Sequence, residues 1–336
     1  MDSLTQIVLG AAVGEAAIGK KVGNWALFWG AVAGTIPDLD VFAKHFTDNV
    51  TALEIHRGFS HSILFSVLMA PILGWLVAQL HKKYHANWKD WTWLMFLALF
   101  THPLLDAHTT WGTQLFWPFE YRVAYKNIFV ADPIYTLPFL ICVITVLFYK
   151  KESKKRNRIN SWGLIMSSSY MVLTIAFKWM AYPHFTQSLK QQNIDYVEVK
   201  TRPTPLNSIL WSANVMVKDG FRIGYYSLFD GGKEVQYSKE IPKNEHLLMP
   251  LLHEKKVQQL IKISQGWYTL EEREGKLLFN DLRFGQNGLE VDASDFIFSF
   301  ELTYDEQGIF QAIERPRTFK DGGGLIKQLY HRMLSN

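Results

Sequence analysis

"SILFSVLMAPILGWLVAQL", residues 62–80, is a run of 19 residues without a charged side chain. A helix needs roughly 20 apolar residues to cross the hydrocarbon core of a bilayer. The run therefore predicts a membrane-spanning helix, and it decides the fold class. The overlapping stretch "HRGFSHS", residues 56–62, leads into it with two histidines, an arginine and two serines. Ionisable groups at the edge of a span are costly in lipid and often indicate a functional site.

Apolar segments of similar length lie on both sides of this run. The two nearest the N-terminus are rich in Gly and Ala, which lets helix backbones approach closely. We predict about six spans, which make residues 1–182 a mainly α-helical, multi-pass membrane domain. The further spans are expected at residues 3–19, 24–42, 91–107, 133–149 and 161–182.

The loops between the predicted spans differ in charge. Residues 20–21, 81–89 and 150–158 together hold 11 Lys and Arg, and alternation of the spans puts these loops on one side. The segments 44–61 and 109–132 on the other side hold four. The positive-inside rule makes the first side cytoplasmic. We therefore predict a protein of the bacterial inner membrane, with the N-terminus and everything after Tyr182 on the periplasmic side.

The basic excess of the chain belongs to these loops. Up to Tyr182 there are 16 Lys and Arg against 11 Asp and Glu, and beyond it 19 against 20. This distribution indicates membrane orientation, so no nucleic-acid partner is expected. The single cysteine, Cys142, excludes an intramolecular disulfide and any zinc site built from several cysteines.

Residues 183–336 predict a soluble, extracytoplasmic α+β domain. Six stretches have strand composition and are separated by turn residues. Residues 244–264 and 322–334 predict helices. The expected strands lie within residues 193–199, 208–217, 221–229, 267–272, 276–284 and 295–304.

Polar residues from three places in the membrane domain are predicted to meet at its outer surface. Asp38 and Asp40 in "PDLD" end the second span, and "HRGFSHS" precedes the third. His102 and Asp106 are four residues apart and share one face of the fourth span. A His and Asp set without cysteine suits zinc, with manganese as an alternative, in a hydrolytic site. The ligands predicted from this convergence are Asp38, Asp40, His56, His61, His102 and Asp106.

Six ligands exceed the need of one catalytic zinc, so one or two ions are expected. A carboxylate that is free or bridges two ions can take the proton of a metal-bound water, which makes Asp38, Asp40 and Asp106 candidate catalytic residues. Arg57, between the two loop histidines, is a candidate clamp for a phosphate, and Arg122 a second one. A cation transporter or an extracytoplasmic sensor with a structural metal remains the alternative.

Five motifs carry a resemblance to a known family. Together they resemble the YdjM-type inner-membrane, metal-dependent hydrolases over about residues 1–150. That family is similar to the zinc-dependent phospholipase C and P1 nuclease superfamily, which implies a helical, phosphodiester-cleaving ancestry. The motifs are "MDSLTQIVLGAAVGEA" (1–16), "GTIPDLDVF" (34–42), "HRGFSHS" (56–62), "THPLLDAHTTWGTQLFWPF" (101–119) and "DPIYTLP" (132–138).

The resemblance implies the same six ligands and a lipid or other amphiphilic substrate, with a phosphoester as the bond cleaved. Many members have a His where this chain has Thr5-Gln6, so Gln6 or Asp2 is a candidate replacement ligand. The superfamily's later His-x-x-x-Glu pair has no counterpart in this sequence. His108 and Asp132 stay open as further members of the site, and the sequence predicts no particular protein partner.

Overall fold

The computed structural model describes residues 1–286, 288, 295–316 and 322–334. The chain forms two compact units, here called unit 1 and unit 2. Unit 1 comprises Met1–Phe42, Ile55–Ile175 and Pro205–Asn207. Unit 2 comprises Ala43–Glu54, Ala176–Thr204 and Ser208–Asn336. The sequence placed the domain boundary after Tyr182, and helix α7 (Lys154–Gln191) continues through that position without a break.

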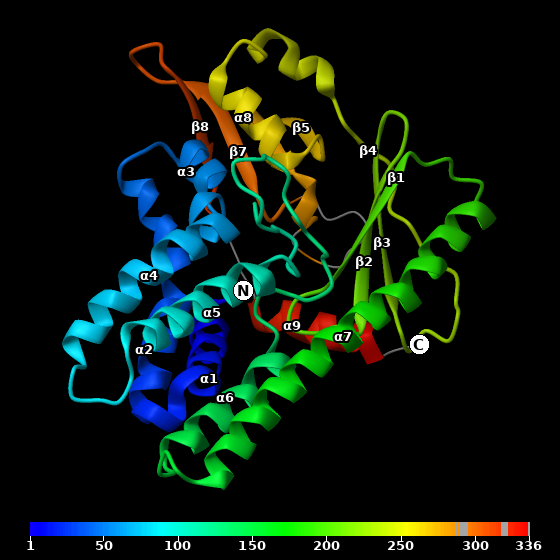
Figure 1. Ribbon diagram of the computed structural model, residues 1–336. Helices are drawn as coiled ribbons and strands as arrows, with labels where there is room; N and C mark the ends of the chain where they lie inside the picture. Colours follow the sequence, from blue (N-terminus) through cyan, green and yellow to red (C-terminus); the bar gives the residue numbers. More distant parts are fainter. Residues whose placement is uncertain (287, 289–294, 317–321, 335–336) are drawn as a thin grey trace. The chain divides into compact units, whose positions relative to one another are not determined.

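Unit 1 is built from helices (Figure 1). α1 packs chiefly against α2, α4 packs against α5, and α1 also contacts α5 and α6. The first part of α7 completes the unit. Apart from α3 (Asn49–Ile55), which lies almost wholly in unit 2, the helices before α7 are α1 (Ser3–Val22), α2 (Asn24–Thr35), the 3-10 helices η1 (Ile36–His45) and η2 (Phe59–His61), α4 (Ile63–Leu80), α5 (Trp88–Asp106) and α6 (Pro133–Leu147).

Three helices among the described residues are long and apolar enough to cross a membrane: Asn24–His45, Ile63–Leu80 and Lys154–Gln191. Pro133–Leu147 is apolar but shorter. The two remaining predicted spans exist as helices, α1 with 20 residues and α5 with 19, and both carry ionisable side chains. A membrane protein is therefore supported, whereas the number of six spans stays a prediction.

Side-chain caps fix where the helices of unit 1 begin. The Ser62 hydroxyl accepts a hydrogen bond from Phe65 N at 3.0 Å and starts α4 directly after "HRGFSH". Asn87 and Asp90 form a capping box at the start of α5. Such caps satisfy backbone N–H groups that have no partner inside the helix. Polar residues directly before α4 and α5 thus end the loops that lead into these two helices.

Glycines let α1 and α2 pack backbone against backbone. A Cβ atom on Gly10 would lie 2.2 Å from the Gly30 carbonyl oxygen, a distance that no side chain tolerates. A Cβ atom on Gly34 would lie 2.8 Å from the Gln6 carbonyl oxygen. This close approach brings the start of α1 next to the end of α2, where the candidate site lies.

A buried ion pair ties α7 to α1. The Arg156 guanidinium donates to both carboxylate oxygens of Glu15 at 2.7 and 2.6 Å, and both side chains are almost fully buried. Asn160, one turn further along α7, donates to the Ala12 carbonyl at 2.9 Å. One face of α7 is therefore fixed on α1.

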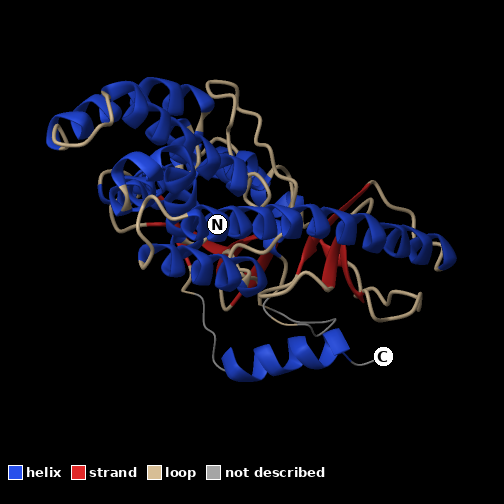
Figure 2. Ribbon diagram, turned by 60° about the horizontal axis from the view of Figure 1, so that its bottom comes forward, coloured by secondary structure: helices blue, strands red, loops and turns tan. Residues whose placement is uncertain are grey.

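Unit 2 contains the strands of the described residues, which are drawn in red in Figure 2. In the chain they all follow α7. Two four-stranded antiparallel sheets have the orders β1-β2-β3-β4 and β5-β6-β7-β8. The α+β class is confirmed, and six strands fall in or overlap the predicted stretches. The strands are β1 (Glu198–Pro203), β2 (Leu210–Met216), β3 (Gly220–Ser227), β4 (Ile241–Pro242), β5 (Tyr268–Arg273), β6 (Lys276–Asp281), β7 (Ser299–Tyr304) and β8 (Phe310–Glu314).

The helices of unit 2 differ from the prediction at one place. The single helix predicted for residues 244–264 is wrong, because the 3-10 helix η3 (Glu245–Leu251) ends before α8 (Lys255–Ser264) begins. Pro250 lacks the N–H group that a continuous helix would use. The closing helix is confirmed as α9 (Gly322–Leu334). On α8, Gln259 and Lys262 bind Glu54 of α3 (Asn49–Ile55) at 2.8 and 2.9 Å.

Candidate metal centre

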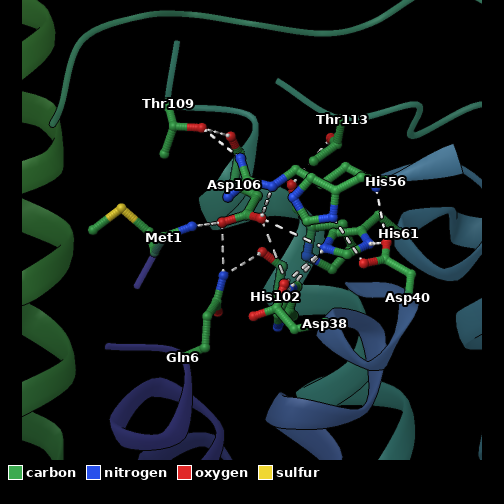
Figure 3. A network of polar contacts seen from close by, with 12 residues as sticks. Met1, Gln6, Asp38, Asp40, His56, His61, His102, Asp106, Thr109 and Thr113 are labelled. Carbon is green, nitrogen blue, oxygen red and sulfur yellow. Dashed lines mark hydrogen bonds and ion pairs between the residues drawn. The ribbon is translucent and has the colours of Figure 1, made fainter. Parts of the chain in front are cut away.

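Four side chains of unit 1 converge on one point (Figure 3). Asp38 comes from η1, His61 from η2, and His102 and Asp106 from the last turns of α5. Each offers one ligand atom, and these atoms all lie within 4.8 Å of one another. The two α5 residues share a helix face because they are four positions apart. The convergence that the sequence predicted is thus present for these four residues, here called the metal-ligand cluster.

The spacing of the ligand atoms fits a single small cation. His61 Nε2 lies 3.0 Å from His102 Nε2 and 3.3 Å from Asp38 Oδ1. The distance from His102 Nε2 to Asp38 Oδ1 is 3.5 Å, and Asp106 Oδ2 lies 3.6 and 3.8 Å from the two imidazoles. Ligands bound at 2.0–2.1 Å in a tetrahedron would be roughly 3.3–3.4 Å apart. The five distances given above, from 3.0 to 3.8 Å, lie on both sides of that value.

Both imidazoles are oriented with Nε2 toward the centre of the cluster. His102 Nδ1 lies 2.6 Å from the Gly34 carbonyl oxygen, and His61 Nδ1 lies 3.2 Å from Asp40 Oδ2. A carbonyl or carboxylate at Nδ1 fixes the tautomer that leaves Nε2 free to bind a metal. The two rings therefore have the arrangement that metal-binding histidines usually have.

Asp106 presents a buried carboxylate oxygen to the cluster. Gln6 Nε2 donates to Asp106 Oδ1 at 2.8 Å, and the Met1 amine contacts the same oxygen. Oδ2 has no hydrogen-bond partner among the described residues, and Arg57 Nε, 2.9 Å away, is not aligned to donate to it. A buried anionic oxygen without a hydrogen bond is expensive. A cation within the cluster would satisfy it.

Asp40 lies beside the metal-ligand cluster and organises the loop before α4. Its Oδ1 lies 2.8 Å from His56 Nδ1. Its Oδ2 accepts hydrogen bonds from Arg57 N at 2.8 Å and the Ser60 hydroxyl at 3.0 Å, besides its contact with His61. Its acceptor positions are thus occupied by residues of "HRGFSHS".

The predicted ligands Asp40 and His56 contribute no atom to the four-residue cluster. His56 is instead held by Asp40, and its side chain is 27 % exposed. Burial lowers the pKa of the His56 imidazole, against the opposing effect of Asp40, which favours the neutral ring at pH 7. Metal binding by Asp40 and His56 therefore stays a prediction.

Arg57 is held inside the site. Its Nη1 donates to the Thr109 hydroxyl at 2.8 Å, its Nε lies beside Asp106, and the residue is only 5 % exposed. Burial lowers the pKa of this guanidinium to about 10, against the opposing effect of nearby carboxylates, so it remains charged at neutral pH. Its φ of 59° is rare for a side chain larger than glycine. This backbone turn directs Arg57 inward, and its predicted role as a phosphate clamp stays a prediction.

The other candidates from the sequence have different partners. Arg122 donates to the His56 carbonyl from both terminal nitrogens at 3.1 Å. His108 pairs with Asn127 at 2.9 Å, and Asp132 caps α6 through the N–H of Ile134. Asp2 caps α1 through Thr5 N. Gln6 alone among the open candidates touches a cluster ligand, as a donor to Asp106.

Three groups that hold the ligands were missed by sequence reasoning. Ser60 and Thr109 lie inside the recognised motifs, so their position next to His61 and Asp106 was the available signal. The Gly34 carbonyl leaves no such signal, because any residue has a carbonyl group. Its role arises only from the close packing of α1 and α2 that glycine permits.

Comparison with known families gives the context for this geometry. The family model described as YdjM inner membrane protein matches residues 1–185. The chain belongs to this family. The match includes the whole metal-ligand cluster and the candidate spans up to the first part of α7. Comparisons with curated proteins and with solved structures found no match.

Proposed function

We propose that this YdjM-family protein is a membrane-bound, metal-dependent hydrolase that cleaves a lipid or another amphiphile, with a phosphoester as the target bond. The observation that carries the proposal is the cluster of two imidazole nitrogens and two carboxylate oxygens at distances that suit one cation. Zinc is the expected ion, and manganese is the alternative. Membership in an inner membrane family favours a substrate that reaches the site from lipid.

Asp38, His61, His102 and Asp106 would hold the metal. When bound, a divalent ion supplies a water molecule whose pKa is about 7 and polarises the phosphoryl oxygens. Asp38 has the most exposed side chain of the four, at 21 %, and so marks the open side of the cluster. Water and substrate would reach the metal from that side.

The neighbouring residues would position the substrate. Asp40 holds His56 through Nδ1, which leaves His56 Nε2 without a partner among the described residues. In hydrolysis, water forms a bond to phosphorus, the bond from phosphorus to the leaving oxygen breaks, and that oxygen takes a proton. We assign His56 Nε2, which carries no proton while Nδ1 donates to Asp40, to take the proton that the attacking water loses and to pass it to this oxygen, and Arg57 to hold Asp106 in place.

A structural metal site, in a transporter or sensor, is the second candidate function. The observation that favours it is the number of ligands, because four protein ligands can close a tetrahedral shell as structural zinc sites do. The two candidates differ in what the metal must do. A hydrolase needs an exchangeable water at the metal, whereas a structural site only needs occupancy.

The deciding experiment measures release of headgroup or phosphate from a panel of lipids in detergent micelles. Wild-type protein is compared with Asp106→Asn, with His56→Gln and with a chelator-treated sample. We expect Asp106→Asn and the chelator to abolish cleavage, and His56→Gln to lower kcat while metal content stays normal. Cleavage that persists after the metal is removed, or a wild-type protein that is inert on every lipid, would favour the structural site.

We also propose that the site faces the periplasm, on the basis of the basic loops. In a Cys142→Ser background, Lys155→Cys lies in the exposed first turn of α7, within the most basic predicted connection, and Lys233→Cys lies in an exposed turn of unit 2. An impermeant thiol reagent added to intact spheroplasts should label position 233 and leave position 155 unlabelled until the membrane is permeabilised. The reverse pattern would place the site in the cytoplasm.

A further inference from the structure

A pocket lies in unit 1, at the far end of α1 from the metal-ligand cluster. It has a volume of about 700 Å³ and is lined by the end of α1, the connection from α6 to α7 and the first turns of α7. Gln6 at the cluster and Lys20 at this pocket are 14 positions apart on α1, which corresponds to about 21 Å. The two sites are therefore separate.

Three cations line the pocket without an ionic partner. In the part of the chain that the structure describes, no carboxylate pairs with Lys20, Lys154 or Arg158, all of which are exposed. Neighbouring basic residues are already paired: Lys21 binds Asp90 at 2.6 Å, and Arg156 binds Glu15.

One carboxylate also lines the pocket. Glu152 is exposed and lies 4.0 Å from Lys151, outside the group of three cations. Three positive charges against one negative charge leave an excess that favours an anion. Because the three cationic side chains line one pocket, they can donate several hydrogen bonds to one ligand, as phosphate recognition requires.

The pocket continues into an apolar stripe on α7. Lys154, Arg158 and Trp162 follow one another at intervals of four residues, and Ile165 comes three residues later, so they share one face of the helix. Trp162 and Ile165 are 56 and 54 % exposed. The opposite face is the one that Arg156 and Asn160 fix to α1. The free face therefore changes from cationic to apolar over about 16 Å.

We propose that this pocket binds the phosphate group of an anionic phospholipid, with the acyl chains along Trp162 and Ile165. The cations match the charge of the headgroup, and basic pockets at the ends of membrane helices bind acidic lipids in this way. Trp is the residue that sits best at the level of the ester groups. A water-soluble phosphate would use the cations but would leave the apolar stripe without a role. This proposal is independent of the hydrolase proposal.

The test titrates purified full-length protein in detergent with dioctanoyl phosphatidylglycerol, and native mass spectrometry counts the bound lipid. Dioctanoyl phosphatidylcholine and glycerol 3-phosphate are the two comparison ligands. Each Lys or Arg near an anionic headgroup contributes about fivefold in affinity, so Lys20→Gln, Lys154→Gln and Arg158→Gln together should lower phosphatidylglycerol affinity about a hundredfold. Phosphatidylcholine should bind wild type at least tenfold more weakly than phosphatidylglycerol.

The matched control removes three exposed cations outside the pocket, at Lys89, Lys150 and Lys155, and should keep wild-type affinity. If the pocket variant is not monodisperse, the single variant Arg158→Gln gives the same test at about fivefold, and Trp162→Ala should also lower the affinity for the lipid but not for glycerol 3-phosphate. An equal loss in the control variant would show general charge attraction and overturn the proposal. Binding of glycerol 3-phosphate as tight as that of the lipid would assign the pocket to a soluble phosphate instead.

Discussion

Replacing Asp40 by Asn tests whether this residue acts on the metal through His61. The Asp40 carboxylate contacts four donors, namely His56 Nδ1, Arg57 N, the Ser60 hydroxyl and His61 Nδ1, at 2.8 to 3.2 Å. An Asn side chain can keep its oxygen toward the last three and turn its amide toward His56, which must then change tautomer. The geometry of the loop is therefore largely kept, and the charge is lost.

The size of the effect follows from the Asp40 charge at His61 Nδ1, which the carboxylate contacts directly at 3.2 Å and through the Ser60 hydroxyl that lies 3.0 Å from both. A hydrogen bond to a charged acceptor contributes about 1.5–3 kcal/mol, and a neutral one about 0.5–1.5 kcal/mol. The difference corresponds to roughly tenfold in metal affinity. Changes of residues that orient metal ligands typically cost about 10–100-fold. We therefore expect Asp40→Asn to bind the same amount of metal with an affinity about 10–100-fold lower.

The assay is competition for zinc between purified protein and a chromophoric chelator of known affinity. Asp48→Asn is the matched control, because Asp48, like Asp40, accepts hydrogen bonds from backbone N–H groups, in its case those of Val50 and Thr51 at the start of α3. It should leave the affinity unchanged. An unchanged affinity in Asp40→Asn would refute the positioning role, and a loss of all bound metal would show that Asp40 is itself a ligand.

Three further outcomes are expected. The double variant His61→Ala, His102→Ala should lose nearly all bound metal in elemental analysis of purified protein, and full occupancy would contradict the site. Wild-type protein should carry one divalent ion per chain in the same measurement, whereas two ions would show that further residues bind metal. Glu15→Gln should destabilise the protein by about 3–5 kcal/mol, because it leaves the Arg156 charge buried and unpaired. Lys21→Gln, which removes the exposed partner of Asp90 and leaves the capping box intact, should change stability by less than about 1 kcal/mol in the same denaturation assay.

The helices of unit 1 could be predicted because their signals are local. Apolar runs of fixed length, bounded by capping residues such as Ser62 and Asp132, define each helix without tertiary information. The break between η3 and α8 was missed because Pro250 was treated as tolerable inside a helix. β8 was missed because Phe310–Glu314 is short and gains its stability from pairing with β7.

The residues of the candidate site could be predicted from the sequence, but the separate role of each residue could not. Residue spacing placed His102 and Asp106 on one helix face, and the alternation of the predicted spans placed "PDLD" at the same membrane surface. The sequence treats Asp38 and Asp40 alike, because they are two residues apart in one motif. The structure separates them, since only Asp38 faces both imidazoles while Asp40 faces the loop. That distinction depends on the turn geometry of η1, for which the sequence carries no periodic signal.

The charges around the metal-ligand cluster explain why one ion is expected. Asp38, Asp40 and Asp106 carry three negative charges, and Arg57 carries one positive charge, while the histidines must be neutral to bind metal. Burial lowers the pKa of the Met1 amine well below its usual value, which favours its neutral form. One divalent cation brings this sum to zero, whereas two would leave two positive charges uncompensated where charge is expensive. A second ion would therefore be retained only together with an anionic ligand such as a phosphate ester.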